Sequence, residues 1–99
     1  MPVHLFTRWG DCVSDPSNHE MEVALQELDA RDPEHPDCWL SDANEWSISS
    51  DENGRVVLQN AETGEFAWRM DNVPRKKVLE LWRMLEDGRI EELKLLKRN

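Results

Sequence analysis

The sequence predicts an α+β domain in which helices pack on one face of an antiparallel β-meander. Apolar residues recur with helical spacing after residue 20 and again after residue 77. Between residues 37 and 70 they alternate with polar residues, and turns that end in glycine separate the alternating segments. Runs of strands beside runs of helices are typical of this class. We expect the order β-α-β-β-β-β-α-α in one domain over residues 1–99, because 99 residues leave no room for a second.

The first two elements are a strand and a capped helix. Alternation from Val3 to Trp9 predicts the strand, with His4, Phe6 and Arg8 on its second face. The segment Ser17-Asn18-His19-Glu20 has the spacing of a capping box, and it precedes an apolar helical face. Prolines 33 and 36 end that helix. The apolar face consists of Met21, Ala24, Leu25 and Leu28.

The predicted meander begins at Asp37, where apolar residues start to recur at every second position. Its turns are residues 51–54 and 61–64, and both end in glycine, as hairpin loops often do. We expect one apolar set to face the helices, and Leu25 and Trp82 to lie against it. The set comprises Trp46, Ile48, Val56, Leu58, Phe66, Trp68 and Met70.

Two helices complete the chain. Asn72-Val73-Pro74 predicts a helix start, because proline suits the first turn, and Gly88 predicts its end. The buried stripes are Val78, Leu81, Trp82 and Leu85 in the first helix, and Ile90, Leu93 and Leu96 in the last.

The charge of the chain excludes some partners and favours others. The formal net charge is −9, and residues 1–71 contain 16 acidic and only 4 basic residues. Binding to nucleic acid requires lysine and arginine against phosphate, so direct nucleic-acid binding is not expected. An acidic surface favours basic partners by steering their association. The alternative is that the charge serves solubility alone.

No membrane span, secretion signal or disulfide framework is predicted. The longest apolar run falls far short of about 18 residues, and the N-terminus lacks a basic start with an apolar stretch. We therefore expect a cytoplasmic protein with Cys12 and Cys38 as free thiols.

Metal and catalytic chemistry are both disfavoured by the sequence. His35-x-x-Cys38 has ligand-like spacing, but structural zinc usually takes two such pairs and the chain has only one. Cys38 as a nucleophile would need His35 as its base, and a thiol on the apolar side of a strand is inert. No phosphate loop, nucleophile elbow or H-E-x-x-H motif is present. We expect no enzyme activity, no metal and no cofactor.

The sequence resembles a family of bacterial inhibitors over residues 3 to about 70. Trp9, the stretch DPSNHEMEVALQELDARDPEHPDCWLSD and the stretch EWSISSDENGRVVLQN are similar to the small immunity proteins of polymorphic toxin systems, particularly the Imm1-like family. The resemblance implies a cytoplasmic protein that binds a cognate toxin domain, often a basic nuclease or deaminase, and blocks its active site. Two alternatives are an acidic phage inhibitor that mimics nucleic acid and a small metal protein built on His35 and Cys38.

A candidate partner-binding surface lies around the first tryptophan of the stretch DPEHPDCWLSDANEW. Trp46 alternates with Ile48 and is expected in the core, whereas Trp39 falls on the opposite face from Cys38 and Leu40. Trp39 is therefore either an aromatic anchor for a partner or packed beneath a helix. We expect the acidic residues near it to form one anionic edge with it. The predicted partner-binding residues are Asp37, Trp39, Asp42, Glu45, Asp51 and Glu52.

Overall fold

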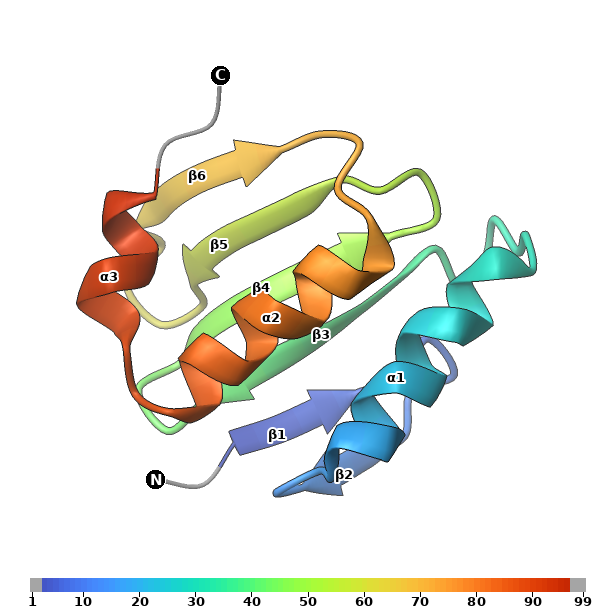
Figure 1. The fold of residues 1–99 in the computed structure, drawn as a ribbon, viewed down its shortest axis with the longest axis horizontal. Helices are drawn as coiled ribbons and strands as arrows, with labels where there is room; N and C mark the ends of the chain where they lie inside the picture. The colour runs from blue at the N-terminus through green and yellow to red at the C-terminus, as the bar shows by residue number, and fades with distance from the viewer. Residues whose placement is uncertain (1–2, 97–99) are drawn as a thin grey trace.

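The computed structural model describes residues 3–96 and confirms the α+β class. Six antiparallel strands form one sheet in the order β2-β1-β3-β4-β5-β6, and the helices lie on one of its faces (Figure 1). None of the helices within residues 3–96 is long and apolar enough to cross a membrane. The elements are β1 Val3–Phe6, β2 Cys12–Ser14, α1 Asn18–Gln26, a 3-10 turn Glu27–Asp29, β3 Asp37–Asp42, β4 Trp46–Asp51, β5 Val56–Asn60, β6 Phe66–Met70, α2 Arg75–Glu86 and α3 Ile90–Leu95.

The first strand is shorter than predicted, and a short second strand follows it. β1 ends at Phe6 because residues 7–11 form a turn, in which the Thr7 hydroxyl accepts hydrogen bonds from the Trp9 and Asp11 amides, each at 3.3 Å. Gly10, with φ of +89°, supplies the left-handed conformation that the turn requires. β2 then pairs with β1 from Cys12 to Ser14. Trp9 therefore lies in the turn with 49% of its surface exposed, and its predicted place in a strand is wrong.

The predicted capping box starts α1. The Ser17 hydroxyl accepts from the Glu20 amide at 3.1 Å, and the Glu20 carboxylate accepts from the Ser17 amide at 2.8 Å. Two amides that have no partner within the helix are satisfied in this way. Met21, Ala24 and Leu25 then face the sheet side and are buried, as predicted.

The core lies between the sheet and the helices. Leu25 and Trp82 are buried there, and the Trp82 indole donates a hydrogen bond of 2.9 Å to the Ile48 carbonyl of β4. The Trp68 indole donates in the same way to the Leu93 carbonyl of α3, at 2.7 Å. These bonds let large aromatic side chains be buried without leaving their N–H groups unpaired.

One residue of the predicted core set faces the other way. Leu58 pairs with Trp68, but the next residue of β5, Gln59, pairs with Phe66 and not with Ala67. The extra residue in β6 is a β-bulge, and a bulge changes the face on which the following side chains lie. Phe66 therefore shares a face with Gln59 and is 60% exposed, so its predicted place in the core is wrong.

Candidate functional site

One face of the sheet has no helix over it in residues 3–96 (Figure 1). Its side chains alternate with those of the core, and most of them are half-buried or exposed. We call this surface the open face. By strand register it comprises His4, Phe6, Cys12, Ser14, Asp37, Trp39, Ser41, Ser47, Ser49, Asp51, Val57, Gln59, Phe66 and Arg69.

An aromatic pair lies near the middle of the open face. Phe6 of β1 and Trp39 of β3 are direct cross-strand partners, and their rings stack with centroids 5.1 Å apart and planes 19° apart. Stacked pairs of this kind contribute about 0.5–1.5 kcal/mol beyond their buried area. The stack fixes Trp39 while leaving it half-buried. Trp39 therefore lies on the open face and not beneath a helix.

Two carboxylates oppose each other beside this stack. Asp37 and Asp51 are cross-strand partners at one end of β3 and β4. Like charges placed directly opposite one another destabilise a sheet. Partial burial raises the pKa of Asp37 above its ordinary value, and the charge of Asp51 raises it further. Asp51 accepts from the Asn53 and Arg55 amides, each at 2.9 Å, whereas no ion pair within residues 3–96 involves Asp37.

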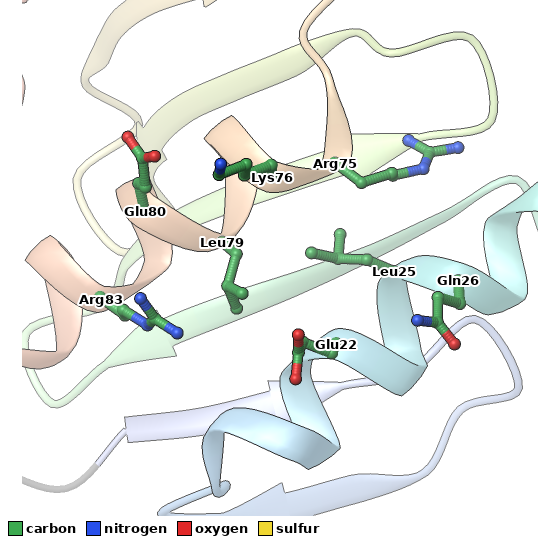
Figure 2. A pocket seen from close by; sticks show the side chains of 8 residues that line it. All are labelled: Glu22, Leu25, Gln26, Arg75, Lys76, Leu79, Glu80 and Arg83. Carbon is green, nitrogen blue, oxygen red and sulfur yellow. The ribbon is translucent and has the colours of Figure 1, made fainter.

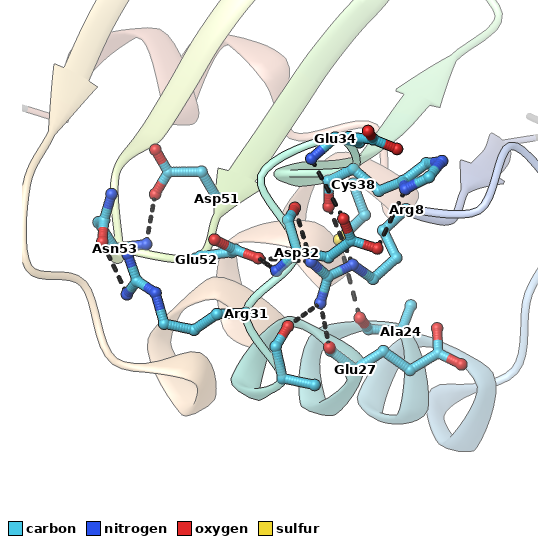
Figure 3. A network of polar contacts seen from close by, with 12 residues as sticks. Arg8, Ala24, Glu27, Arg31, Asp32, Glu34, Cys38, Asp51, Glu52 and Asn53 are labelled. Atoms are coloured by element: carbon cyan, nitrogen blue, oxygen red, sulfur yellow. Dashed lines mark hydrogen bonds and ion pairs between the residues drawn. The ribbon is translucent and has the colours of Figure 1, made fainter.

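The neighbouring carboxylate, Glu52, is part of a buried polar cluster (Figure 3). The Arg8 side chain is fully buried, and Glu52 accepts hydrogen bonds from its guanidinium and from the Asp32 amide. These bonds, the Asp32 amide first, hold the pKa of Glu52 below its ordinary value. Glu52 is therefore structural rather than available to a partner. Arg8 also donates to the carbonyls of Glu27, Ala30, Asp32 and His35.

The two remaining predicted site residues lie at the opposite end of the sheet. Asp42 is buried, and its carboxylate accepts from the Asn44 and Trp46 amides, each at 2.9 Å. Glu45 follows in the same turn with φ of +69°. Five residues of strand, about 17 Å, separate this turn from Asp37. The single anionic edge expected from the sequence is wrong.

The structure thus brings together half of the predicted site and adds aromatic residues to it. Asp37, Trp39 and Asp51 share the open face, while Asp42, Glu45 and Glu52 lie elsewhere. The sequence could have identified Phe6, because the alternation of β1 already predicted its side chain on the face of the sheet away from the core. Phe66 was not, because no sequence signal marks the bulge that exposes it.

An exposed aromatic, Trp9, lies at the same end of the sheet as Asp37. Trp9 packs against His35 with ring centroids 5.2 Å apart, and the Arg8 guanidinium lies 5.1 Å from the Trp9 ring. The imidazole Nδ1 of His35 lies 3.1 Å from the Asp32 carboxylate. Trp9 and His35 therefore cover the buried guanidinium of Arg8 from outside.

The two cysteines are free and differ in environment. Cys12 is exposed, whereas Cys38 is buried with its Sγ 4.0 Å from the Ala24 carbonyl. Burial raises the pKa of Cys38 to about 12, so its thiol stays protonated at neutral pH. Within residues 3–96, no three histidine, cysteine or acidic side chains come together as metal ligands would.

A shallow groove of about 440 Å³ lies between α1 and α2 (Figure 2). Its charged side chains largely have partners within the chain: Arg75 donates to the Asp51 carbonyl at 3.0 Å and lies 3.6 Å from Asp29. Arg83 donates to the Asn18 amide oxygen. Arg75, the first residue of α2, is thus held by contacts inside the protein.

No known protein family, curated protein or solved structure matches this chain. The likeness to immunity proteins therefore stays a prediction. The open face carries the most distinctive chemistry of the described residues, an aromatic stack beside a carboxylate that forms no ion pair within residues 3–96.

Proposed function

We propose that this protein is a non-enzymatic inhibitor that binds a basic protein domain through its open face, as bacterial immunity proteins bind their toxins. The observation that carries the proposal is the half-buried Phe6–Trp39 stack directly beside the Asp37–Asp51 pair. Aromatic side chains dominate the energetic centres of protein interfaces, and charges around them steer association. The net charge of −9 adds to this steering.

The Asp37–Asp51 pair supports a role outside the fold. Placing the two carboxylates opposite one another costs stability, and no cation within residues 3–96 forms an ion pair with Asp37. A residue that weakens the fold without an internal partner is typical of a functional surface. A lysine or arginine of a partner, placed between the two carboxylates, would remove the repulsion.

The partner class follows from the charge and from the sequence resemblance. Toxin domains that act on nucleic acid carry basic clefts, because they must bind phosphate. An acidic face with an aromatic anchor is complementary to such a cleft and would occlude it. The buried, protonated Cys38 offers no nucleophile, which supports inhibition by binding rather than by chemistry.

Binding kinetics against the protein encoded by the adjacent gene test the proposal. Asp37→Lys should slow association and flatten its salt dependence, because it removes steering charge at the interface. Trp39→Ala should instead speed dissociation, with a loss of about 2 kcal/mol or more. Glu62→Lys, an exposed carboxylate in the β5–β6 turn, is the matched control. If Asp37→Lys slows association no more than Glu62→Lys at low and high salt, the open face is not the interface.

Glu52 is unsuitable for this test, although the sequence singled it out. Reversing its charge would bring a lysine against the buried guanidinium of Arg8 and would disrupt the fold. Asp37→Lys avoids the problem, since the new lysine faces Asp51 and forms a favourable cross-strand pair.

A further inference from the structure

We propose that the element of the partner received by the open face is an α-helix with a basic side, lying along the strands between Trp39 and Phe66. The inference rests on the proposed function and specifies how the same face is used. It follows from the sizes of the side chains across β3 to β6, from the spacing of those strands and from the charge at one end.

Small side chains lie on β4 of the open face, and aromatic side chains lie on β3 and β6 to either side; we call the part of the face over β4 the low centre. One row across the sheet reads Trp39, Ser49, Val57, Arg69 from β3 to β6. The next row reads Ser41, Ser47, Gln59, Phe66. β4 therefore contributes only serines to both rows, while Trp39 on β3 lies at one side of the first row and Phe66 on β6 lies at the opposite side of the second.

The width of this low centre fits a helix. Three strand spacings separate β3 from β6, which is about 14 Å. A helix with its side chains is about 10–12 Å across. The other side of the sheet already accepts a helix, since α2 lies over β3 and β4 there (Figure 1). A strand or a single loop would leave much of this width unfilled.

The bulge in β6 completes one side of the low centre. In a regular strand, Phe66 would share the face of Trp68 and point toward the helices. The extra residue, Ala67, places it beside Gln59 instead, with 60% of its surface exposed. An exposed phenylalanine is costly in water, and contact with an apolar part of the helix would cover it.

Charge selects the kind of helix and argues against a second copy of this chain. Asp37 and Asp51 lie at the end of β3 and β4, where a helix along these strands would pass. Lysine or arginine on that part of the helix would be attracted to them. Two copies of this protein, each with a net charge of −9, would instead bring their carboxylates face to face.

Two synthetic basic peptides of about 20 residues test the inference in an NMR titration of the labelled protein. They share one composition, but one is stapled as a helix and the other carries prolines that prevent a helix. The stapled peptide should shift the amide signals of Ser47, Ser49 and Val57, and bind at least about tenfold more tightly than the other. Ser49→Trp, which fills the low centre, should weaken this binding about tenfold. Ser14→Trp, on the edge strand β2 beside His4, is the matched control and should leave the binding unchanged.

Several outcomes would overturn the helix inference. They are equal affinity for the two peptides, signal shifts over α1 and α2 in place of the open face, or full binding by Ser49→Trp. Self-association of the protein through this face, measured by sedimentation, would assign it to a second copy and would also overturn it. A further comparison distinguishes failure of the helix inference from failure of the proposed function. If the adjacent gene's product binds Ser49→Trp normally but loses affinity for Asp37→Lys, the function stands and the helix does not.

Discussion

The two faces of the sheet are built from the same strands but use their residues differently. On the covered face, Leu40, Ile48 and Leu58 are completely buried, and the buried indole of Trp82 has its hydrogen-bond acceptor. On the open face, Asp37 lies opposite another carboxylate, and Trp39 is only partly covered. The covered face thus supplies stability, while the open face keeps a partly exposed aromatic ring and, within residues 3–96, a carboxylate that forms no ion pair.

The same contrast appears between two consecutive acidic residues. Glu52 is buried against Arg8 and the Asp32 amide, while Asp51 points onto the open face toward Asp37. Asp51 is the last residue of β4 and Glu52 the first residue of the turn after it, so one step along the chain separates a charge on the open face from one buried against Arg8. Four substitutions test this difference between the two faces, and their expected effects range from a large loss of stability to a small gain.

Trp82→Ala on the covered face should have the largest effect, a loss of about 3–5 kcal/mol in the free energy of unfolding. The side chain is completely buried, so truncation leaves a cavity and removes the hydrogen bond to Ile48. Urea denaturation measures the loss. Trp9→Ala, in the exposed β1–β2 turn, should lose less than about 1 kcal/mol. Equal losses would mean that Trp82 is not the centre of the core.

Arg8→Met should cost about 3 kcal/mol or more, because it removes the cation from a buried cluster and leaves several carbonyls without donors. Thermal denaturation at neutral pH measures this. Arg55→Met is the control, since Arg55 pairs with Asp71 at the surface and should contribute at most about 1 kcal/mol. A neutral Arg8→Met would show that the cluster does not hold the loop from Glu27 to His35.

Trp39→Ala should cost about 1–2 kcal/mol of stability, well below the loss at Trp82. Part of the ring is already exposed, and the main loss is the stack with Phe6. The variant should remain folded, with an unchanged far-ultraviolet spectrum and a slightly lower denaturation midpoint. A loss as large as that of Trp82→Ala would place Trp39 in the core and remove it as an anchor.

Asp37→Asn should have the smallest effect and the opposite sign, a gain of about 0.5 kcal/mol at neutral pH. The pKa of Asp37 is raised in the folded protein, so its ionised form weakens the fold and its protonated form does not. The gain should therefore be complete at a pH above this raised pKa and should vanish below 3.8, the ordinary value, where both states are protonated. Urea denaturation of both proteins between acid and neutral pH checks this. A gain that persists at low pH would show that charge is not its cause.

Much of the fold was predictable because its signals are local. The capping box at Ser17 and the alternation around Ile48 and Leu58 each follow from a few neighbouring residues. β2 was missed because it has only three residues, of which two are exposed, so it shows no apolar alternation. The bulge at Ala67 was missed because it arises from pairing between strands and leaves no mark in the sequence of β6.

The candidate site was only half predictable, for a different reason. Asp37, Asp42, Asp51 and Glu52 are alike in the sequence, because each lies at the end of a strand or directly after it. Their roles depend on which donors the fold brings to them: two amides reach Asp42, and Arg8 reaches Glu52 from 44 residues away. The amides at Asp42 and Asp51 come from the adjacent turns, whereas the partner of Glu52 is set by the tertiary structure, so the sequence alone could not separate Glu52 from Asp37.

The bulge in β6 also bears on how this protein behaves at high concentration. β6 is an edge strand, and the free amides and carbonyls of a regular edge form a template on which strands of other molecules can assemble. The extra residue at Ala67 interrupts the even spacing of these groups and increases the local twist. The charged Arg69 lies on the same short strand. The feature that exposes Phe66 thus also makes this edge a poor starting point for fibrillar aggregation.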